Sequence, residues 1–215
     1  MYCTQGKGWA NLDIKQLAGV RLVHVSCNHE VAWACDSHGR AYVRLGPPTP
    51  APPNTLPQAW LPVDTLDNQD ATPHITAVYV GPESYMVWAV DSKRRVFVRE
   101  GIFPELQIGT GWLEVGGVQA KELCLSASAV WALGVSGDVF RRFNIGPTNY
   151  VGDYWKRVPG NLASLSASVD DCLWGISSDG SALRLSYHVL PCQGNPSAAD
   201  ALPQARTIED GWELL

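Results

Sequence analysis

Hydrophobic and polar positions alternate over short runs along most of the chain, and many runs come in pairs around a polar turn. The stretch 87–99 is the clearest case, because an alternating run around Trp88 and a second run ending at Arg99 flank the polar residues 92–95. A period of two residues is typical of a half-buried β-strand, and two such runs around a short turn predict a hairpin. We therefore predict a β-hairpin over 87–99.

The same hairpin pattern occurs four times, with further copies at 31–44, 130–142 and 173–185. Three copies carry a glycine six residues after their tryptophan, and three carry an arginine eleven residues after it. The hairpin tryptophans are 55, 43 and 43 residues apart. A proline-rich stretch, 46–54, and a polar stretch, 64–73, account for the longer first interval. The chain is therefore predicted to be a repeat protein.

Two more strand signals precede each hairpin. The first is a second tryptophan that follows a G-x-x or P-x-x step and precedes an aliphatic residue by three positions; the next is an alternating run such as 75–80. Together with the hairpin they give four strands per unit, and the units span about 6–46, 57–101, 109–146 and 152–187. A four-stranded repeat of about 40–45 residues predicts the blades of a β-propeller. Eight tryptophans are predicted to form the structural core of the repeats, packed between blades: Trp9, Trp33, Trp60, Trp88, Trp112, Trp131, Trp155 and Trp174.

These motifs resemble the tectonin β-propeller repeat, whose pattern is G-x-x-W, then an aliphatic residue with Pro-Gly, then V-W-A-V-x-x-x-G-x-V-x-x-R. Trp155 with 158–160 and the stretch 87–99 match it well, whereas Arg94, Gly175 and the missing final arginine of the last unit depart from it. The resemblance covers residues 6–187 and implies an all-β fold of four tectonin-type blades. Because propellers of this type usually close with more than four blades, we expect these blades to belong to a larger propeller. Tight closure of four blades and a dimer that covers the open edges are the alternatives.

Composition agrees with an all-β protein, since 46% of residues are hydrophobic, 17% are charged, and 20 Gly and 15 Pro supply turns. The net charge of -5 and the scattered Lys and Arg argue against a nucleic-acid or anionic-membrane surface. No signal peptide or membrane span is predicted. Six cysteines share no common position in the repeat, which favours reduced thiols in a cytosolic protein over three disulfides in a secreted one.

No catalytic constellation is predicted. The five histidines include no pair at a metal-binding spacing, and the aspartates cluster in hairpin turns, where their carboxylates accept hydrogen bonds from the backbone. Neither a nucleophile elbow nor a phosphate-binding loop occurs. We therefore expect a protein that is not an enzyme and that holds no cofactor and no metal.

The repeat pattern stops after residue 187, where a stretch rich in Pro, Ala and Ser, 188–208, predicts a flexible linker. The final segment, 209–215, has the form acidic-W-x-x-L and resembles the motif that binds ubiquitin-like autophagy modifiers of the light-chain-3 and GABARAP type. In such binding an extended peptide pairs with an exposed strand edge. The resemblance implies that Trp212 and Leu215 enter two pockets, while Glu209 and Asp210 meet basic residues. The alternative is that Trp212 packs on the propeller as a partial strand.

The resemblance implies an intracellular scaffold or adaptor in autophagy and vesicle trafficking. The expected partners are trafficking or tethering proteins through the propeller and ubiquitin-like autophagy modifiers through the tail. The expected location is cytoplasmic, peripheral on endoplasmic-reticulum exit sites or on autophagic and endosomal vesicles. A lectin that binds glycans or lipopolysaccharide is the alternative, because secreted tectonin-like propellers bind glycans on their blade loops.

Overall fold

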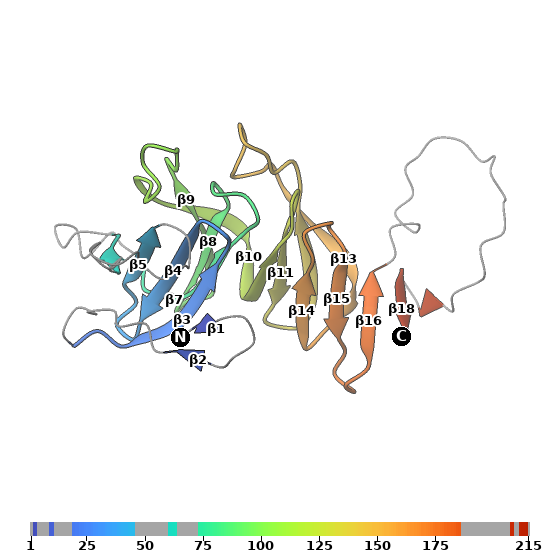
Figure 1. Ribbon diagram of the computed structural model, residues 1–215. Coiled ribbons are helices and arrows are strands. Elements are labelled where there is room, and N and C mark those ends of the chain that lie inside the picture. Colours follow the sequence, from blue (N-terminus) through green and yellow to red (C-terminus); the bar gives the residue numbers. More distant parts are fainter. Residues whose placement is uncertain are drawn as a thin grey trace. The chain divides into compact units, whose positions relative to one another are not determined.

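The computed structural model describes residues 2–3, 9–10, 19–45, 60–63, 73–185, 207–208 and 211–214. Over these residues all regular elements are β-strands (Figure 1), as the hydrophobic alternation predicts. No helix that could span a membrane occurs in this part of the chain. The molecule divides into two compact units, Met1–Gly116 and Gly117–Leu215.

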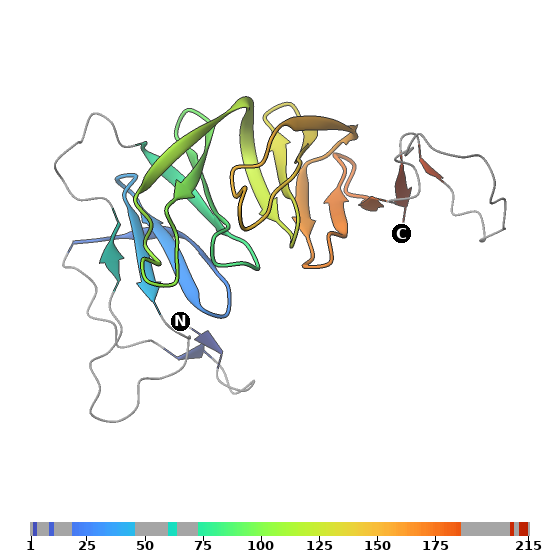
Figure 2. The same cartoon turned by 90° about the horizontal axis from the view of Figure 1, so that it is seen from above.

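The first unit holds two blades. In the first blade, four strands pair in chain order (Figure 2): β3 (Leu22–Cys27), β4 (Val31–Asp36), β5 (Ala41–Leu45) and β6 (Leu61–Pro62). The second blade is built in the same order from β7 (Ile75–Val80), β8 (Val87–Asp91), β9 (Arg95–Glu100) and the beginning of β10 (Gly111–Leu125). A separate two-stranded sheet pairs β1 (Tyr2–Cys3) with β2 (Trp9–Ala10).

The second unit begins within β10 and also holds two blades. The third blade consists of the end of β10 followed by β11 (Val130–Gly134), β12 (Asp138–Arg142) and β13 (Trp155–Asn161). The last blade pairs strands in the order β14 (Ser164–Ala167), β15 (Leu173–Ile176), β16 (Ala182–Leu185), β18 (Trp212–Leu214) and β17 (Thr207–Ile208). The two strands beyond β16 in this sheet, β18 and β17, therefore come from the C-terminal segment, 207–214.

Aspartates fix the hairpin turns, as their positions in the sequence predict. The buried carboxylate of Asp91 accepts hydrogen bonds from the backbone N–H groups of Lys93 (2.9 Å) and Arg95 (2.8 Å). Arg94, between them, has a φ of 64°, in the left-handed region where the other hairpins place a glycine. The hydrogen bonds of the Asp91 carboxylate to the backbone explain how this hairpin keeps its turn without the glycine.

In the second, third and fourth sequence units, the strand at or directly after the opening tryptophan pairs with the preceding hairpin. In the first blade β6 pairs with β5, through Tyr42↔Pro62 and Val43↔Leu61. In the third blade β13 pairs with β12, and Trp155 lies opposite Arg142. The sequence units group this strand with the hairpin that follows it, so units and blades are offset by one strand. We call this strand, such as β6 or β13, the fourth strand of the blade in which it pairs.

Tryptophans form the centre of both cores. In the first unit Trp33 is fully buried and meets Trp112 edge to face, with the ring centroids 6.0 Å apart. In the second unit Trp131 is fully buried among apolar residues of the third and last blades. Trp88 is also buried, Trp60, Trp112 and Trp155 are partly buried, and the Trp9 side chain lies outside the described residues. Trp174 differs from the other hairpin tryptophans, because 42% of its surface is exposed.

Candidate functional site

The C-terminal strand β18 pairs antiparallel with β16. The partners are Leu185↔Trp212, Arg184↔Glu213 and Leu183↔Leu214. On its other side β18 pairs with β17, through Ile208↔Trp212 and Thr207↔Glu213. Residues Trp212–Leu214 of the sequence motif are therefore a strand within the last blade (Figure 1).

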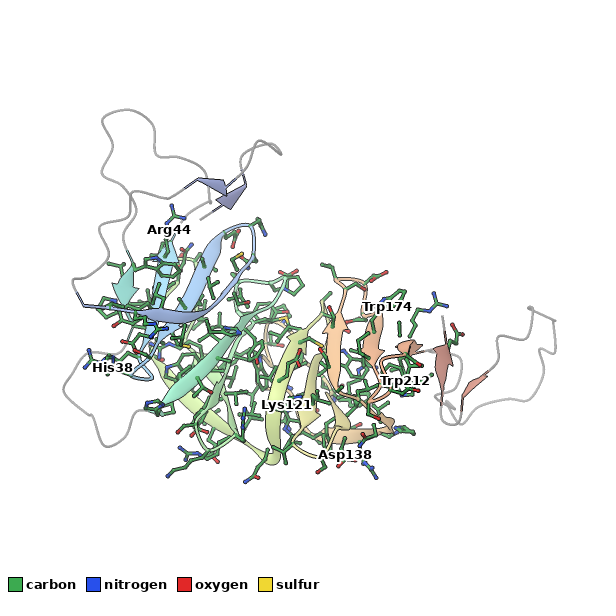
Figure 3. The ribbon with its side chains drawn as sticks, turned by 90° about the horizontal axis from the view of Figure 1, so that it is seen from below. His38, Arg44, Lys121, Asp138, Trp174 and Trp212 are labelled. Atoms are coloured by element: carbon green, nitrogen blue, oxygen red, sulfur yellow. The ribbon has the colours of Figure 1, made fainter. Side chains whose placement is uncertain are left out.

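The indole of Trp212 fills a closed apolar pocket. Only 2% of the residue is exposed, and its Nε1–H donates a hydrogen bond of 2.6 Å to the carbonyl oxygen of Pro159. Gly160 makes room for the ring, because a Cβ at this position would lie 2.5 Å from Nε1. The apolar cluster that includes Trp212 also contains Trp131, Val158, Leu162, Leu165, Leu173, Leu183 and Leu185. The pocket thus combines an apolar wall with an acceptor for the indole N–H. Trp212 is labelled in Figure 3.

Glu213 is partly buried on the same strand pair, beside the more exposed Arg184. Its Oε2 accepts a hydrogen bond of 2.5 Å from the Arg184 guanidinium, and the two side chains form an ion pair across β16 and β18. The hydrogen bond and the negative charge of Glu213 both raise the pKa of Arg184. The pair fixes the alignment of β18 from the solvent side, while Trp212 fixes it from the core side.

Trp212 occupies the same place in the last blade that Trp155 occupies in the third. Trp155 lies opposite Arg142, which is eleven residues after Trp131, and Trp212 lies opposite Leu185, which is eleven residues after Trp174. β18 is thus the fourth strand of the last blade. A signal for this exists in the sequence, because the spacing Trp-x-x-aliphatic is shared by 212–215 and by the other fourth-strand segments 60–63, 112–115 and 155–158.

The last blade lacks the buried arginine found beside the fourth-strand tryptophan of the two preceding blades. Arg99 lies over the ring of Trp112 (5.1 Å from its guanidinium carbon to the ring centroid), and Arg142 lies over Trp155 (5.4 Å). Each arginine also donates a hydrogen bond to the loop that follows it: Nε of Arg99 to the Ile108 carbonyl at 2.9 Å, and Nε of Arg142 to the Val151 carbonyl at 3.0 Å. Leu185 takes this position in the last blade, so no described arginine stacks on Trp212 from β16.

The four residues predicted to bind an autophagy modifier are only partly described. Glu209, Asp210 and Leu215 lie outside the described residues, and Trp212 is buried as a strand residue of the last blade. The docked strand corresponds to the alternative arrangement, a partial strand on the propeller. The modifier-binding role of Glu209, Asp210, Trp212 and Leu215 stays a prediction.

Other reactive groups are scattered through the fold. Among the residues with described positions, no group of three or more His, Cys, Asp or Glu side chains could hold a metal ion. Cys27, Cys35, Cys124 and Cys172 are free thiols, and burial raises the pKa of Cys35 to about 11. A thiol with so high a pKa is a poor nucleophile at neutral pH.

The family model of the tectonin domain matches residues 65–178, which is more than half of the chain. The chain therefore belongs to the tectonin family, and the prediction of tectonin-type β-propeller blades is confirmed. A relative is human tectonin beta-propeller repeat-containing protein 2, which is 38% identical over 128 residues. The match covers 60% of this chain and 9% of that protein, so it spans a small part of the relative's length.

Solved structures share the fold at low sequence identity. Human WBSCR16 matches with a TM-score of 0.54 and 11% identity, over 78% of this chain and 48% of that one. A chain of the complex of Kap60 with yeast RCC1 (Prp20) matches with a TM-score of 0.52 and 10% identity, over 80% and 45%. YCF48 from Cyanidioschyzon merolae matches with a TM-score of 0.52 and 16% identity, over 76% and 50%. At these identities the likeness shows the fold alone.

Proposed function

We propose that this chain is a non-enzymatic, intracellular protein-binding scaffold of autophagy and vesicle trafficking. Membership of the tectonin family and the 38% identity to tectonin beta-propeller repeat-containing protein 2 support a propeller scaffold. Its blades hold trafficking or tethering proteins, and it acts in the cytoplasm, at endoplasmic-reticulum exit sites or on autophagic and endosomal vesicles. Its C-terminal segment, 209–215, binds a ubiquitin-like autophagy modifier of the light-chain-3 or GABARAP type.

The observation that carries the modifier-binding proposal is the conformation of β18. Residues Trp212–Leu214 are extended and pair antiparallel with the edge of β16. Binding by β-augmentation requires the same extended backbone, with side chains entering pockets on the receptor. The modifier would replace β16 as the pairing partner, with Trp212 and Leu215 in its two pockets. Because Trp212 is buried in the docked form, this exchange requires β18 to leave the blade.

The test is a calorimetric titration of a purified light-chain-3 or GABARAP-type modifier with a peptide of residues 207–215 and with the intact chain. We expect the peptide to bind in the micromolar range, because an extended peptide loses conformational entropy on binding. Trp212→Ala/Leu215→Ala should abolish this binding in both the peptide and the chain. A wild-type peptide that fails to bind either modifier type would refute the proposal.

A further inference from the structure

We propose that the last blade and β13 of the third blade together form a peptide-binding groove for extended segments of the form Trp-x-x-aliphatic, and that β18 is its exchangeable ligand. The groove consists of the free edge that β16 would present without β18, the Pro159 carbonyl, and the space above Gly160. Its class of ligand is a short strand with one tryptophan, supplied here by the chain's own C-terminal segment. This inference rests in part on the proposed function: where β18 also binds a modifier, the groove and the modifier compete for Trp212.

The groove is selective for tryptophan for a physical reason. The Pro159 carbonyl accepts a hydrogen bond from Nε1 of Trp212 inside an apolar cluster, where water cannot replace the lost donor. A phenylalanine would fill much of the pocket but leave this carbonyl without its donor. Gly160 has a φ of 120° and leaves the space that the indole occupies. The pocket therefore recognises both the size of the ring and its N–H group.

The fourth strand of the last blade is held less firmly than that of the third blade. β18 has three residues and β13 has seven. Between Leu185 and Trp212 lie 26 residues, whereas 12 residues separate Arg142 from Trp155. A longer connection costs more entropy to close and lowers the effective concentration of the strand at its edge. Leu185 stands opposite Trp212 where Arg142 stands opposite Trp155, so β16 does not supply the arginine that stacks on the fourth-strand tryptophan of the third blade. These differences favour a strand that can leave and return.

Docking and modifier binding exclude each other, because the indole of Trp212 cannot occupy two pockets at once. The apparent affinity for the modifier is then reduced in proportion to the undocked fraction. If about one molecule in ten is undocked, the intact chain binds about tenfold more weakly than the free peptide. The docked strand thereby acts as an intramolecular inhibitor of modifier binding.

The first test asks whether the groove binds the strand in trans. Full-length chain carrying Trp212→Ala, which leaves the pocket without its indole, is titrated with a fluorescent peptide of residues 207–215. We expect saturable binding that an unlabelled peptide displaces, weaker binding of the Trp212→Phe peptide, and loss with the Trp212→Ala peptide. If the Trp212→Ala chain retains its far-ultraviolet circular dichroism and still does not bind the wild-type peptide, the proposed groove is refuted. The full-length Arg184→Glu variant provides a second receptor, titrated with a 207–215 peptide that carries Glu213→Arg, which restores an ion pair across β16.

The second test measures the competition through Arg184. Arg184→Glu places a negative charge opposite Glu213 and weakens docking without changing the sequence of the tail. We expect this variant to bind a light-chain-3 or GABARAP-type modifier several-fold more tightly than the wild-type chain, approaching the free peptide. The matched control is Arg157→Glu, which breaks the ion pair with Asp138 within the third blade and should leave the affinity unchanged.

The outcomes separate the two proposals. If the wild-type chain binds the modifier as tightly as the free peptide, and Arg184→Glu changes nothing, the competition is refuted while the proposed function stands. If the free peptide does not bind the modifier, the proposed function fails. The trans-peptide titration then decides by itself whether the groove exists.

Discussion

At the scale of single residues, equivalent tryptophans differ in what covers them. Trp131 and Trp174 occupy the same position of consecutive hairpins, yet Trp131 is fully buried and Trp174 is 42% exposed. Trp131 lies in the cluster that contains Trp212 and Val158, so residues from two fourth strands surround it. A blade face is buried by its neighbour, and a residue's own sequence context does not report that neighbour.

We predict that Trp131→Ala lowers the free energy of unfolding by about 3–5 kcal/mol, the range for truncating a buried aromatic side chain. Trp174→Ala should cost only about 1 kcal/mol, because much of the side chain already contacts water. Urea unfolding followed by far-ultraviolet circular dichroism measures both losses. Equal losses would show that Trp174 is buried in solution as deeply as Trp131.

A second prediction at this scale concerns Arg142, which is nearly buried and donates hydrogen bonds to the carbonyl oxygens of Val151 and Gly152. Arg142→Met keeps an apolar stem over Trp155 but leaves both carbonyls without this donor, so we expect a loss of about 1–3 kcal/mol. Hydrogen exchange should accelerate in the loop 143–152. The control Arg157→Met removes an exposed ion pair with Asp138 and should cost about 0–1 kcal/mol.

At the scale of elements, alternation and turn residues predict most strands of the four blades, but pairing follows from contacts that the sequence does not display. The strand of Trp155 could be placed with the run before it or after it in the chain. It pairs with β12 because Arg142 lies over the Trp155 ring and bonds the loop between the two strands. The offset between units and blades follows from such contacts, which is why periodicity alone missed it.

Side chains, rather than strand pairing, link the first two blades at their inner strands. His24 of β3 accepts a hydrogen bond at Nδ1 from the Val78 N–H of β7 (3.3 Å), and Ser26 Oγ accepts one from the Val80 N–H (2.9 Å). Burial lowers the pKa of His24 below its ordinary value of 6.5. A protonated imidazole carries a proton on Nδ1 and cannot accept this bond, so the contact requires the neutral ring.

This contact predicts that acid weakens the first unit. Because the folded pKa of His24 is depressed, the unfolded chain binds more protons as pH falls below 6.5, so stability is full above 6.5 and declines toward the folded pKa. We expect the urea midpoint to fall between about pH 7 and about pH 5. His24→Gln, which keeps an acceptor without a titrating ring, should reduce the decline. His29→Gln, at an exposed position, should not change it.

At the scale of the whole molecule, each unit has its own core, and the C-terminal strand belongs to that of the second. The sequence places Trp212 outside the repeats, because 26 residues separate it from Leu185 and the repeat pattern ends before it. The same Trp-x-x-aliphatic spacing fits both a fourth strand and a modifier-binding peptide. Local sequence cannot choose between these uses, since the choice depends on the relative free energies of the docked and released strand.

This balance sets an upper limit on what Trp212 contributes to stability. If β18 can leave while the rest of the unit stays folded, Trp212→Ala costs at most the free energy of docking. A docked fraction of 90–99% corresponds to about 1–3 kcal/mol, less than the loss expected for Trp131→Ala. Hydrogen exchange should accelerate at the β16 and β18 amides, while the β4 and β8 amides of the first unit keep their protection. A loss as large as that of Trp131→Ala, spread over the whole second unit, would instead make β18 an inseparable part of the core and leave no strand free to bind a modifier.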